Sequence, residues 1–235
     1  MNGASLRPQA HSAELPSLVR TYLDRALPTV VDDVKAVRVH QAGEMRRKPE
    51  ARPVKFEATE EFEVHRVAFR WRARFAIVGP VAMNVVDGFA DGEGQLRVSL
   101  LGIPLQKQTG FETSIGEAMR YLAELAWAPH AIAANRELSW RELDDSRVEV
   151  SCRAAQTTAR VAWEFDSEGD LVRAKGLRPL PRRKSYVPTA WGGEFRDYCT
   201  FGDLRIPAAA EAWWELREGR FVYWRGRVDA AELVS

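Results

Sequence analysis

The stretch Val67-Ala-Phe-Arg-Trp-Arg-Ala-Arg-Phe-Ala-Ile77 decides the fold class of this chain. Every second residue in it is apolar, and arginines stand between the apolar residues. Because side chains of a β-strand point alternately to opposite faces of the sheet, the pattern predicts a strand with one apolar and one cationic face. Phe69, Trp71 and Phe75 are large aromatic residues, so we expect the apolar face to meet a covering layer or to form the wall of a cavity.

The arginine row of this strand, Arg70, Arg72 and Arg74, has two interpretations. We expect it to lie in solvent on the outer face of the sheet. The alternative is a row that recognises anions inside a cleft, because guanidinium groups bind carboxylates and phosphates well.

The composition narrows the function classes. The chain has 235 residues and a formal net charge of +1, which favours one large or two small domains and gives no electrostatic reason to expect a nucleic acid partner. No apolar run approaches the roughly 18 residues of a transmembrane helix. The N-terminus lacks the apolar segment of a signal peptide, so we expect a cytoplasmic protein. The sequence leaves the oligomeric state open.

Metal and cofactor motifs are missing from the sequence. The four histidines and two cysteines do not have zinc-site spacing, and neither a P-loop nor a dinucleotide-binding glycine pattern occurs. We therefore expect no cofactor and no metal. Cys152 and Cys199 are too few for a disulfide framework, and we predict that both are reduced and buried.

Two helices are predicted. Residues 1–12 resemble a disordered leader, and Ser12 offers an N-cap to an amphipathic helix over Ala13–Leu27. The second helix is central, over residues 115–128. Ser114 and Glu117 fit a capping box at its start, and Arg120 and Glu124 have the spacing of an ion pair on its polar face.

The rest of the chain has the period of strands. Turn residues over 87–94 and a basic, proline-containing stretch over 177–184 predict a turn region and a loop. Many short strands with hairpin turns around one helix predict an α+β, mainly β fold, in which a curled antiparallel sheet covers the central helix. We assign this fold to a single domain over residues 13–230.

Several segments together resemble an uncharacterised family of bacterial proteins, a domain of unknown function. The resemblance covers roughly residues 15–228. The chain has His65-Arg66 and Ala190 at places where the family pattern often has prolines. This difference bears on the shape of the local loops and not on membership of the family. The matching segments are Leu15–Tyr22, Gln41–Arg46, Phe69–Ala73, Asp87–Gly94, Arg120–Pro129, Trp140–Asp144, Trp191–Tyr198, Arg205–Pro207 and Tyr223–Arg225.

The resemblance implies a half-open antiparallel barrel of the bacterial lipoprotein-carrier type, whose concave face holds acyl chains or other hydrophobic ligands. It carries over no catalytic residues, and fold alone does not fix function.

The main functional hypothesis is therefore a binding protein for an apolar or amphiphilic small molecule. Phe69, Trp71 and Phe75 would form its wall, with Met119 and Trp127 facing them from the helix. Arg120 or Arg178 would hold a polar head group, and Glu124 and Trp191 complete the candidate ligand-binding set. Two alternatives stay open: an enzyme that uses Glu124 or Asp87 as a general base, and a structural or partner-binding protein whose core is filled by its own side chains.

Overall fold

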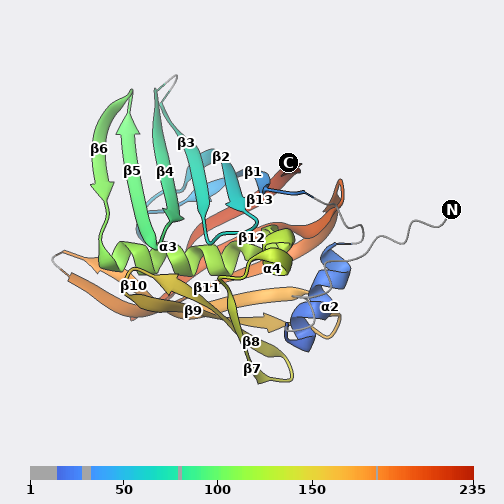
Figure 1. Cartoon of the computed structure of the whole chain (residues 1–235). Coiled ribbons are helices and arrows are strands. Elements are labelled where there is room, and N and C mark those ends of the chain that lie inside the picture. Colours follow the sequence, from blue (N-terminus) through green and yellow to red (C-terminus); the bar gives the residue numbers. More distant parts are fainter. Residues whose placement is uncertain (1–14, 28–32, 79–80, 184) are drawn as a thin grey trace.

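The computed structural model of the chain describes residues 15–27, 33–78, 81–183 and 185–235. Across these residues thirteen strands form one antiparallel sheet in the order β6-β5-β4-β3-β2-β1-β13-β12-β11-β10-β9-β8-β7. The sheet curls around the long helix α3 (Phe111–Glu124), with β3–β6 on one side and β9–β11 on the other (Figure 1). This is the curled sheet over a central helix that the sequence predicts.

The strands form two runs that meet where β1 pairs with β13. The first run is β1 (Ala36–Met45), β2 (Val54–Glu63), β3 (Phe69–Val78), β4 (Val81–Ala90), β5 (Glu93–Leu100) and β6 (Ile103–Gln108). The second is β7 (Ser139–Asp144), β8 (Arg147–Ala154), β9 (Thr157–Phe165), β10 (Leu171–Arg182), β11 (Ser185–Phe201), β12 (Leu204–Leu216) and β13 (Gly219–Val234). The pairing of β1 with β13 joins the two runs into one sheet.

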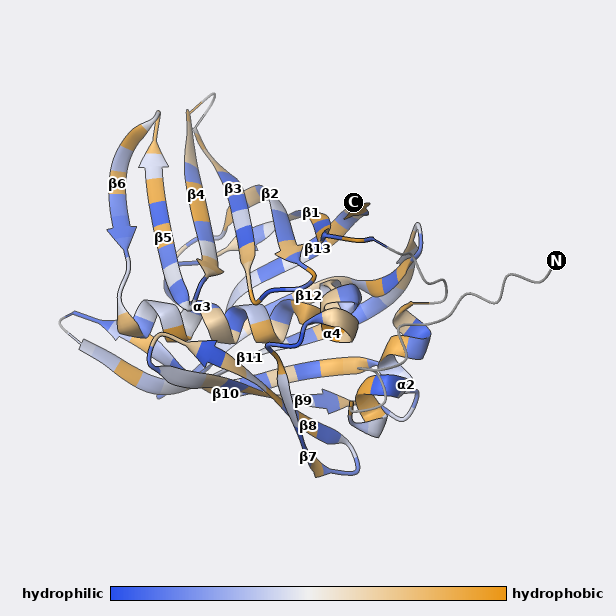
Figure 2. Ribbon diagram, in the orientation of Figure 1, coloured by the Kyte–Doolittle hydropathy of each residue, from blue (hydrophilic) through white to orange (hydrophobic). Residues whose placement is uncertain are grey.

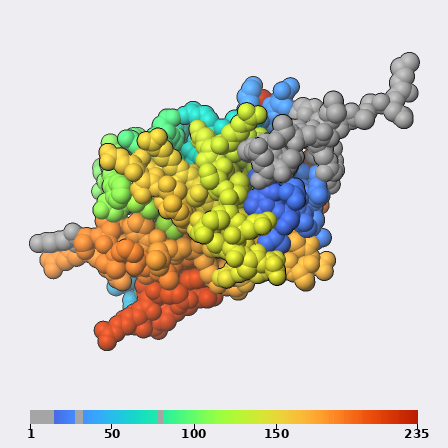
Figure 3. Space-filling model, turned by 60° about the horizontal axis from the view of Figure 1, so that its bottom comes forward, coloured from blue at the N-terminus to red at the C-terminus, as the bar shows by residue number. Residues whose placement is uncertain are grey.

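Three shorter helical elements complete the fold: α2 (Ser17–Ala26), the 3-10 turn η1 (Leu125–Trp127) and α4 (Pro129–Ala134). Helix α2 packs against α4, β8 and β12, and Figure 3 shows its blue atoms beside the yellow-green segment that follows α3. The Tyr22 hydroxyl donates a hydrogen bond to the Ala126 carbonyl oxygen over 2.8 Å, which ties α2 to the end of the central helical segment.

Strand β3 has the orientation that its alternation predicts. Phe69, Trp71 and Phe75 are buried on the concave side, and the three arginines between them are exposed. The alternation of hydropathy is visible along the strands in Figure 2. Ile77 departs from the pattern: it is 47% exposed, because it lies at the end of the strand, next to an irregularity in the pairing of β3 with β4.

Two segments predicted as turn or loop are strand. Strand β4 continues through Asp87 to Ala90, and only Asp91-Gly92 turns, with positive φ at both residues. Strand β10 continues through the predicted loop to Arg182. Its pairing with β9 ends at Lys175, so Pro179 and Pro181 lie where β10 has a neighbour on one side alone, which is where a strand tolerates proline.

The helix boundaries also differ from the prediction. Helix α3 begins at Phe111 with Gly110 as its N-cap, so Ser114 and Glu117 lie inside the helix and the predicted capping box is wrong. The Ser114 hydroxyl instead accepts a hydrogen bond from the Gly94 amide, which joins α3 to β5. Helix α2 begins after Pro16; the predicted leader over residues 1–12 and the Ser12 cap lie outside the described residues.

Both cysteines are free thiols, but only one matches the predicted environment. Cys152 is buried in β8, and burial raises the pKa of its thiol to about 12. Cys199 is exposed on β11, so its predicted burial is wrong.

Candidate functional site

A cavity of about 570 Å³ lies on the concave side of the sheet, between the β1–β6 run, helix α3 and the strands β10–β13. Its volume is within the range of small-molecule sites. Hollows of similar volume on the outer face are more open and are lined by charged side chains such as Glu57 and Arg74. The apolar wall of the cavity is formed by Met45, Val54, Trp71, Phe75, Met83, Val85, Leu96, Val98, Leu105, Trp214 and Trp224.

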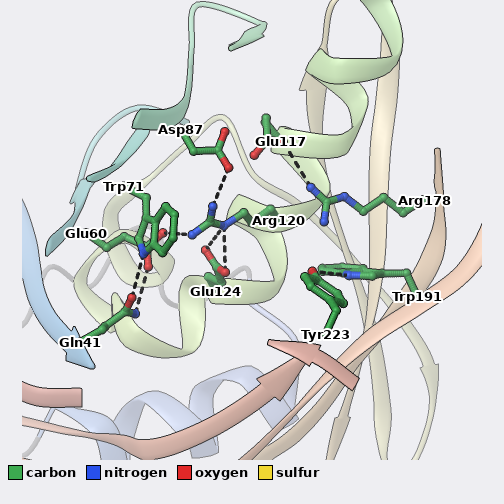
Figure 4. A network of polar contacts seen from close by, with 10 residues as sticks. All are labelled: Gln41, Glu60, Trp71, Asp87, Glu117, Arg120, Glu124, Arg178, Trp191 and Tyr223. Carbon is green, nitrogen blue, oxygen red and sulfur yellow. Dashed lines mark hydrogen bonds and ion pairs between the residues drawn. The ribbon is translucent and has the colours of Figure 1, made fainter. Parts of the chain in front are cut away.

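Arg120 of α3 is the centre of the polar end of this cavity (Figure 4). Its Nη1 donates to Asp87 Oδ2 over 2.7 Å, its Nη2 donates to Glu60 Oε1 over 3.1 Å, and its Nε donates to both carboxylate oxygens of Glu124. The guanidinium also lies 4.8 Å from the centre of the Trp71 ring. Arg120 therefore has carboxylate partners at all three nitrogens and an aromatic face beside it.

A second chain of hydrogen bonds fixes the position of Glu60, the partner of Arg120 on β2. Trp71 Nε1 donates to Gln41 Oε1 over 3.0 Å, and Gln41 Nε2 donates to Glu60 Oε2 over 3.1 Å. Glu60 is fully buried. Because both of its oxygens have donors, its position is determined by β1, by β3 through the Trp71 ring, and by α3.

Arg178 of β10 forms the second cationic position. Its Nη2 donates to Glu117 Oε1 over 3.3 Å, and its guanidinium lies 4.9 Å from the centre of the Trp191 ring. Trp191 Nε1 donates to the Tyr223 hydroxyl, and both residues are drawn in Figure 4. Gly116 leaves the space for this arrangement, since a side chain there would meet Arg178 Nε at 3.4 Å.

Asp87 and Glu117 face each other across the cavity end. Asp87 Oδ1 and Glu117 Oε2 are buried and receive no donor from the part of the chain that the structure describes. Each of these two side chains can therefore accept a further hydrogen bond at that oxygen. Burial and the neighbouring Asp87 charge raise the pKa of Glu117 well above its ordinary value.

Burial and neighbouring charges also shift the pKa values of Glu60 and Arg120. Burial, followed by the nearby Glu124 charge, raises the pKa of Glu60. Burial alone would lower the pKa of Arg120, but the surrounding carboxylates raise it well above its ordinary value. Arg120 thus stays charged, while Glu60 and Glu117 are the carboxyl groups whose protonated form is favoured by burial.

The structure brings together five of the predicted ligand-binding residues at the cavity. Trp71, Phe75, Arg120, Glu124 and Arg178 all line it. Whether they bind a ligand stays a prediction.

The other four predicted residues do not line the cavity. Phe69 packs against Tyr121 of α3, and Trp191 lies behind Arg178. The predicted orientation of Met119 and Trp127 is wrong. The Met119 side chain contacts Gly176 of β10, and Trp127 Nε1 donates to the Pro207 carbonyl oxygen. Both residues lie on sides of the helical segment that face the second run of strands, β7–β13.

Sequence reasoning missed the roles of Glu60 and Glu117. Glu60 follows Phe56 and Ala58 at the inward-facing positions of β2, and Phe62 comes next. A charged residue in an otherwise apolar inward series was the signal that could have found it. Glu117 was assigned to a capping box, so its contact with Arg178 was not anticipated.

Neither a metal-binding cluster nor a membrane-crossing helix is found among the described residues. Within the described ranges, His, Cys, Asp and Glu side chains form no group of three or more suited to a metal ion. In the same ranges, every helix is too short or too polar to cross a membrane.

The curled sheet around α3 places the chain in the class of half-open barrels that resemble lipoprotein carriers. A solved structure of a LolA superfamily protein from Nitrosomonas europaea superposes with a TM-score of 0.50 at 11% identity, covering 93% of each chain. A DUF1329 family protein from Desulfovibrio piger has a TM-score of 0.49 at 11% identity, covering 92% of this chain and 90% of the other.

The chain belongs to a family of unknown function, DUF6544, whose model matches residues 5–226. No curated protein matches the sequence. The family match confirms the predicted membership, and the LolA superfamily structure supports the fold and nothing of the function.

Proposed function

We propose that this protein binds an apolar or amphiphilic small molecule in the concave cavity. The observation that carries the proposal is a cavity of about 570 Å³ with a contiguous apolar wall beside a buried charged cluster. Binding sites for small molecules combine a mostly apolar lining with a few placed polar groups. The resemblance to a LolA superfamily protein supports the proposal at the level of fold.

The apolar wall gives the proposal a measurable consequence. Burial of each methylene contributes about 0.8 kcal/mol, which is about a fourfold change in affinity. Affinity for linear alcohols should therefore rise about fourfold per methylene until the chain fills the cavity, and then level off.

The test is calorimetric titration of the purified protein with linear alcohols, together with native mass spectrometry for a co-purified ligand. Val98→Trp fills the cavity from β5 without touching the charged cluster, and should abolish binding. Ile77→Trp, at an exposed position outside the cavity, is the matched control and should bind normally. A protein that binds no alcohol and carries no ligand would refute the proposal, as would unchanged binding in Val98→Trp.

General acid–base catalysis in the same cavity is a second candidate, favoured by Glu117, whose carboxyl group lines the cavity and whose pKa is raised by burial and by the neighbouring Asp87 charge. Glu124 is less suited to this role than the sequence predicts, because both of its oxygens accept from Arg120. If the second candidate is right, a ligand recovered from the protein should be converted on incubation with the wild type and left intact by Glu117→Gln. Equal conversion by both proteins would exclude it.

A further inference from the structure

The polar end of the cavity contains more carboxyl groups than guanidinium groups. Four buried or nearly buried carboxyls, Glu60, Asp87, Glu117 and Glu124, surround Arg120 and Arg178. Among the described residues, the further charges that line the cavity are Arg47 and Glu112, which are exposed and of opposite sign. With every carboxyl ionised, the buried cluster has a net charge of −2, from four negative and two positive groups.

The arginines are poorly placed to receive an anionic ligand. Arg120 already donates to three carboxylates, and its guanidinium lies over Phe69 and Trp71. Arg178 donates to Glu117 and lies over Trp191 and Trp214. A ligand carboxylate or phosphate would have to displace a built-in carboxylate and would add negative charge to a site that already has more carboxyl than guanidinium groups.

The vacant hydrogen-bonding capacity is on the acidic side. Asp87 and Glu117 are 7% and 8% exposed, line the cavity, and each keeps one buried oxygen that receives no donor from the described residues. A buried carboxylate oxygen without a donor is costly. A ligand group that donates hydrogen bonds and carries a positive charge would satisfy both oxygens.

The strand register places an apolar surface directly beside this acidic pair. Asp87, Val85 and Met83 follow one another on the inward face of β4 and all line the cavity. Leu96 pairs with Asp87 and Val98 pairs with Val85 on β5. An alkyl chain attached to a group held by Asp87 would therefore run along the wall formed by β4 and β5.

We infer that the cavity recognises a cationic amphiphile, a protonated amine on an apolar chain, whose ammonium group binds between Asp87 and Glu117. This inference rests on the proposed function and specifies its ligand class. The bound ammonium donates hydrogen bonds to the two carboxylate oxygens that lack a donor, and with every carboxyl ionised it changes the net charge of the cluster from −2 to −1.

The experiment compares three ten-carbon probes that differ only in the head group: decylammonium, decanol and decanoate. Dissociation constants are measured by calorimetry at neutral pH, below the concentrations at which the probes form micelles. Decylammonium should bind at least tenfold more tightly than decanol, and decanoate should bind most weakly. Glu117→Gln should lose the preference for the amine and keep the affinity for decanol.

Two variants make the test specific. Glu112→Gln removes an exposed carboxylate that also lines the cavity, so it controls for general attraction of cations and should keep the amine preference. Asp87→Asn is a second route to the acidic pair if Glu117→Gln fails to fold.

The outcomes separate the inference from the proposed function. If decanol binds and the amine binds no better, or if decanoate binds most tightly, the inference is wrong and the proposed function stands. If Glu112→Gln loses the preference as strongly as Glu117→Gln, the acidic pair is not the recognition site. If none of the three probes binds, the proposed function itself fails.

Discussion

Replacement of Arg120 by methionine should be among the most damaging single changes in this protein. The guanidinium pairs with Glu60, Asp87 and Glu124 through side chains that are 0%, 10% and 18% exposed, and Arg120 itself is 12% exposed. Methionine keeps much of the apolar stem and removes the charge. The loss leaves buried carboxylates without a partner, which costs about 3–5 kcal/mol.

The expected change is easily measured. In a chain of 235 residues, each kcal/mol lowers the melting temperature by about 2–4 °C, so Arg120→Met should lower it by about 6–20 °C. Urea unfolding followed by Trp fluorescence gives the free energy, and differential scanning calorimetry gives the melting temperature. The control is Arg141→Met: Arg141 pairs with Glu149 but is 66% exposed, and its loss should cost at most about 1 kcal/mol.

A double variant tests the stated cause. If unpaired carboxylates cause the loss, Arg120→Met combined with Glu60→Gln should be less destabilised than the sum of the single variants, by about 0.5–3 kcal/mol. Strict additivity, or an Arg120→Met variant as stable as Arg141→Met, would refute the account of the cluster as mutually dependent charges.

Three further predictions concern the rest of the structure. Burial raises the pKa of Glu60 and Glu117 in the folded state, so the folded protein binds more protons than the unfolded chain above the ordinary glutamate pKa of about 4.5. The contribution of these two groups to stability is complete below that pH and is lost as the pH rises through the raised pKa values. Urea midpoints of the wild type should therefore fall from weakly acidic toward alkaline pH, and they should fall less steeply in Glu117→Gln. Gly43→Ala should destabilise the folded protein by about 3 kcal/mol or more, because the new Cβ would lie 2.1 Å from the Arg225 carbonyl oxygen. Gly176→Ala should cost about 1–3 kcal/mol, because its Cβ would meet the flexible end of the Met119 side chain. Equal urea midpoints for the two variants would contradict this prediction. In the native state, Cys199 should react with a thiol reagent, and Cys152 should react only after unfolding. Rapid reaction of two thiols per native chain would contradict this prediction.

The alternation of apolar and polar residues was enough to orient the sheet. In β3, the period of two predicted which face is buried, and the paired-strand architecture followed from the hairpin turns. The two Asp-Gly pairs show where such reasoning ends. Asp91-Gly92 is a turn, but Gly88 lies inside β4. Glycine is needed at position 88 because the Phe69 carbonyl oxygen lies 2.8 Å from where a Cβ would be. Glycine in a turn and glycine at a close backbone approach have the same sequence signal.

The candidate site was less accessible to sequence reasoning, because its members come from distant strands. The ion pair of Arg120 with Glu124 could be predicted from their spacing on one helix. The pairs with Glu60 and Asp87 depend on how far the sheet curls, which local periodicity does not encode. Met119 and Trp127 were oriented wrongly for the same reason: α3 is covered on two sides, and the sequence does not say which run of strands faces which side.

The three alternatives that the sequence leaves open do not exclude one another in this fold. On the side of β8–β10, the concave face is filled: Trp163 is fully buried and donates to the Leu122 carbonyl oxygen of α3. On the side of β1–β5, a cavity separates the wall from the helix. A structural role alone would be served by apolar residues at positions 117, 120 and 124, since apolar replacements of buried ion pairs are often neutral or stabilising. The charged cluster lies instead where the helix meets the cavity, which favours a role in recognition over a role in holding the helix.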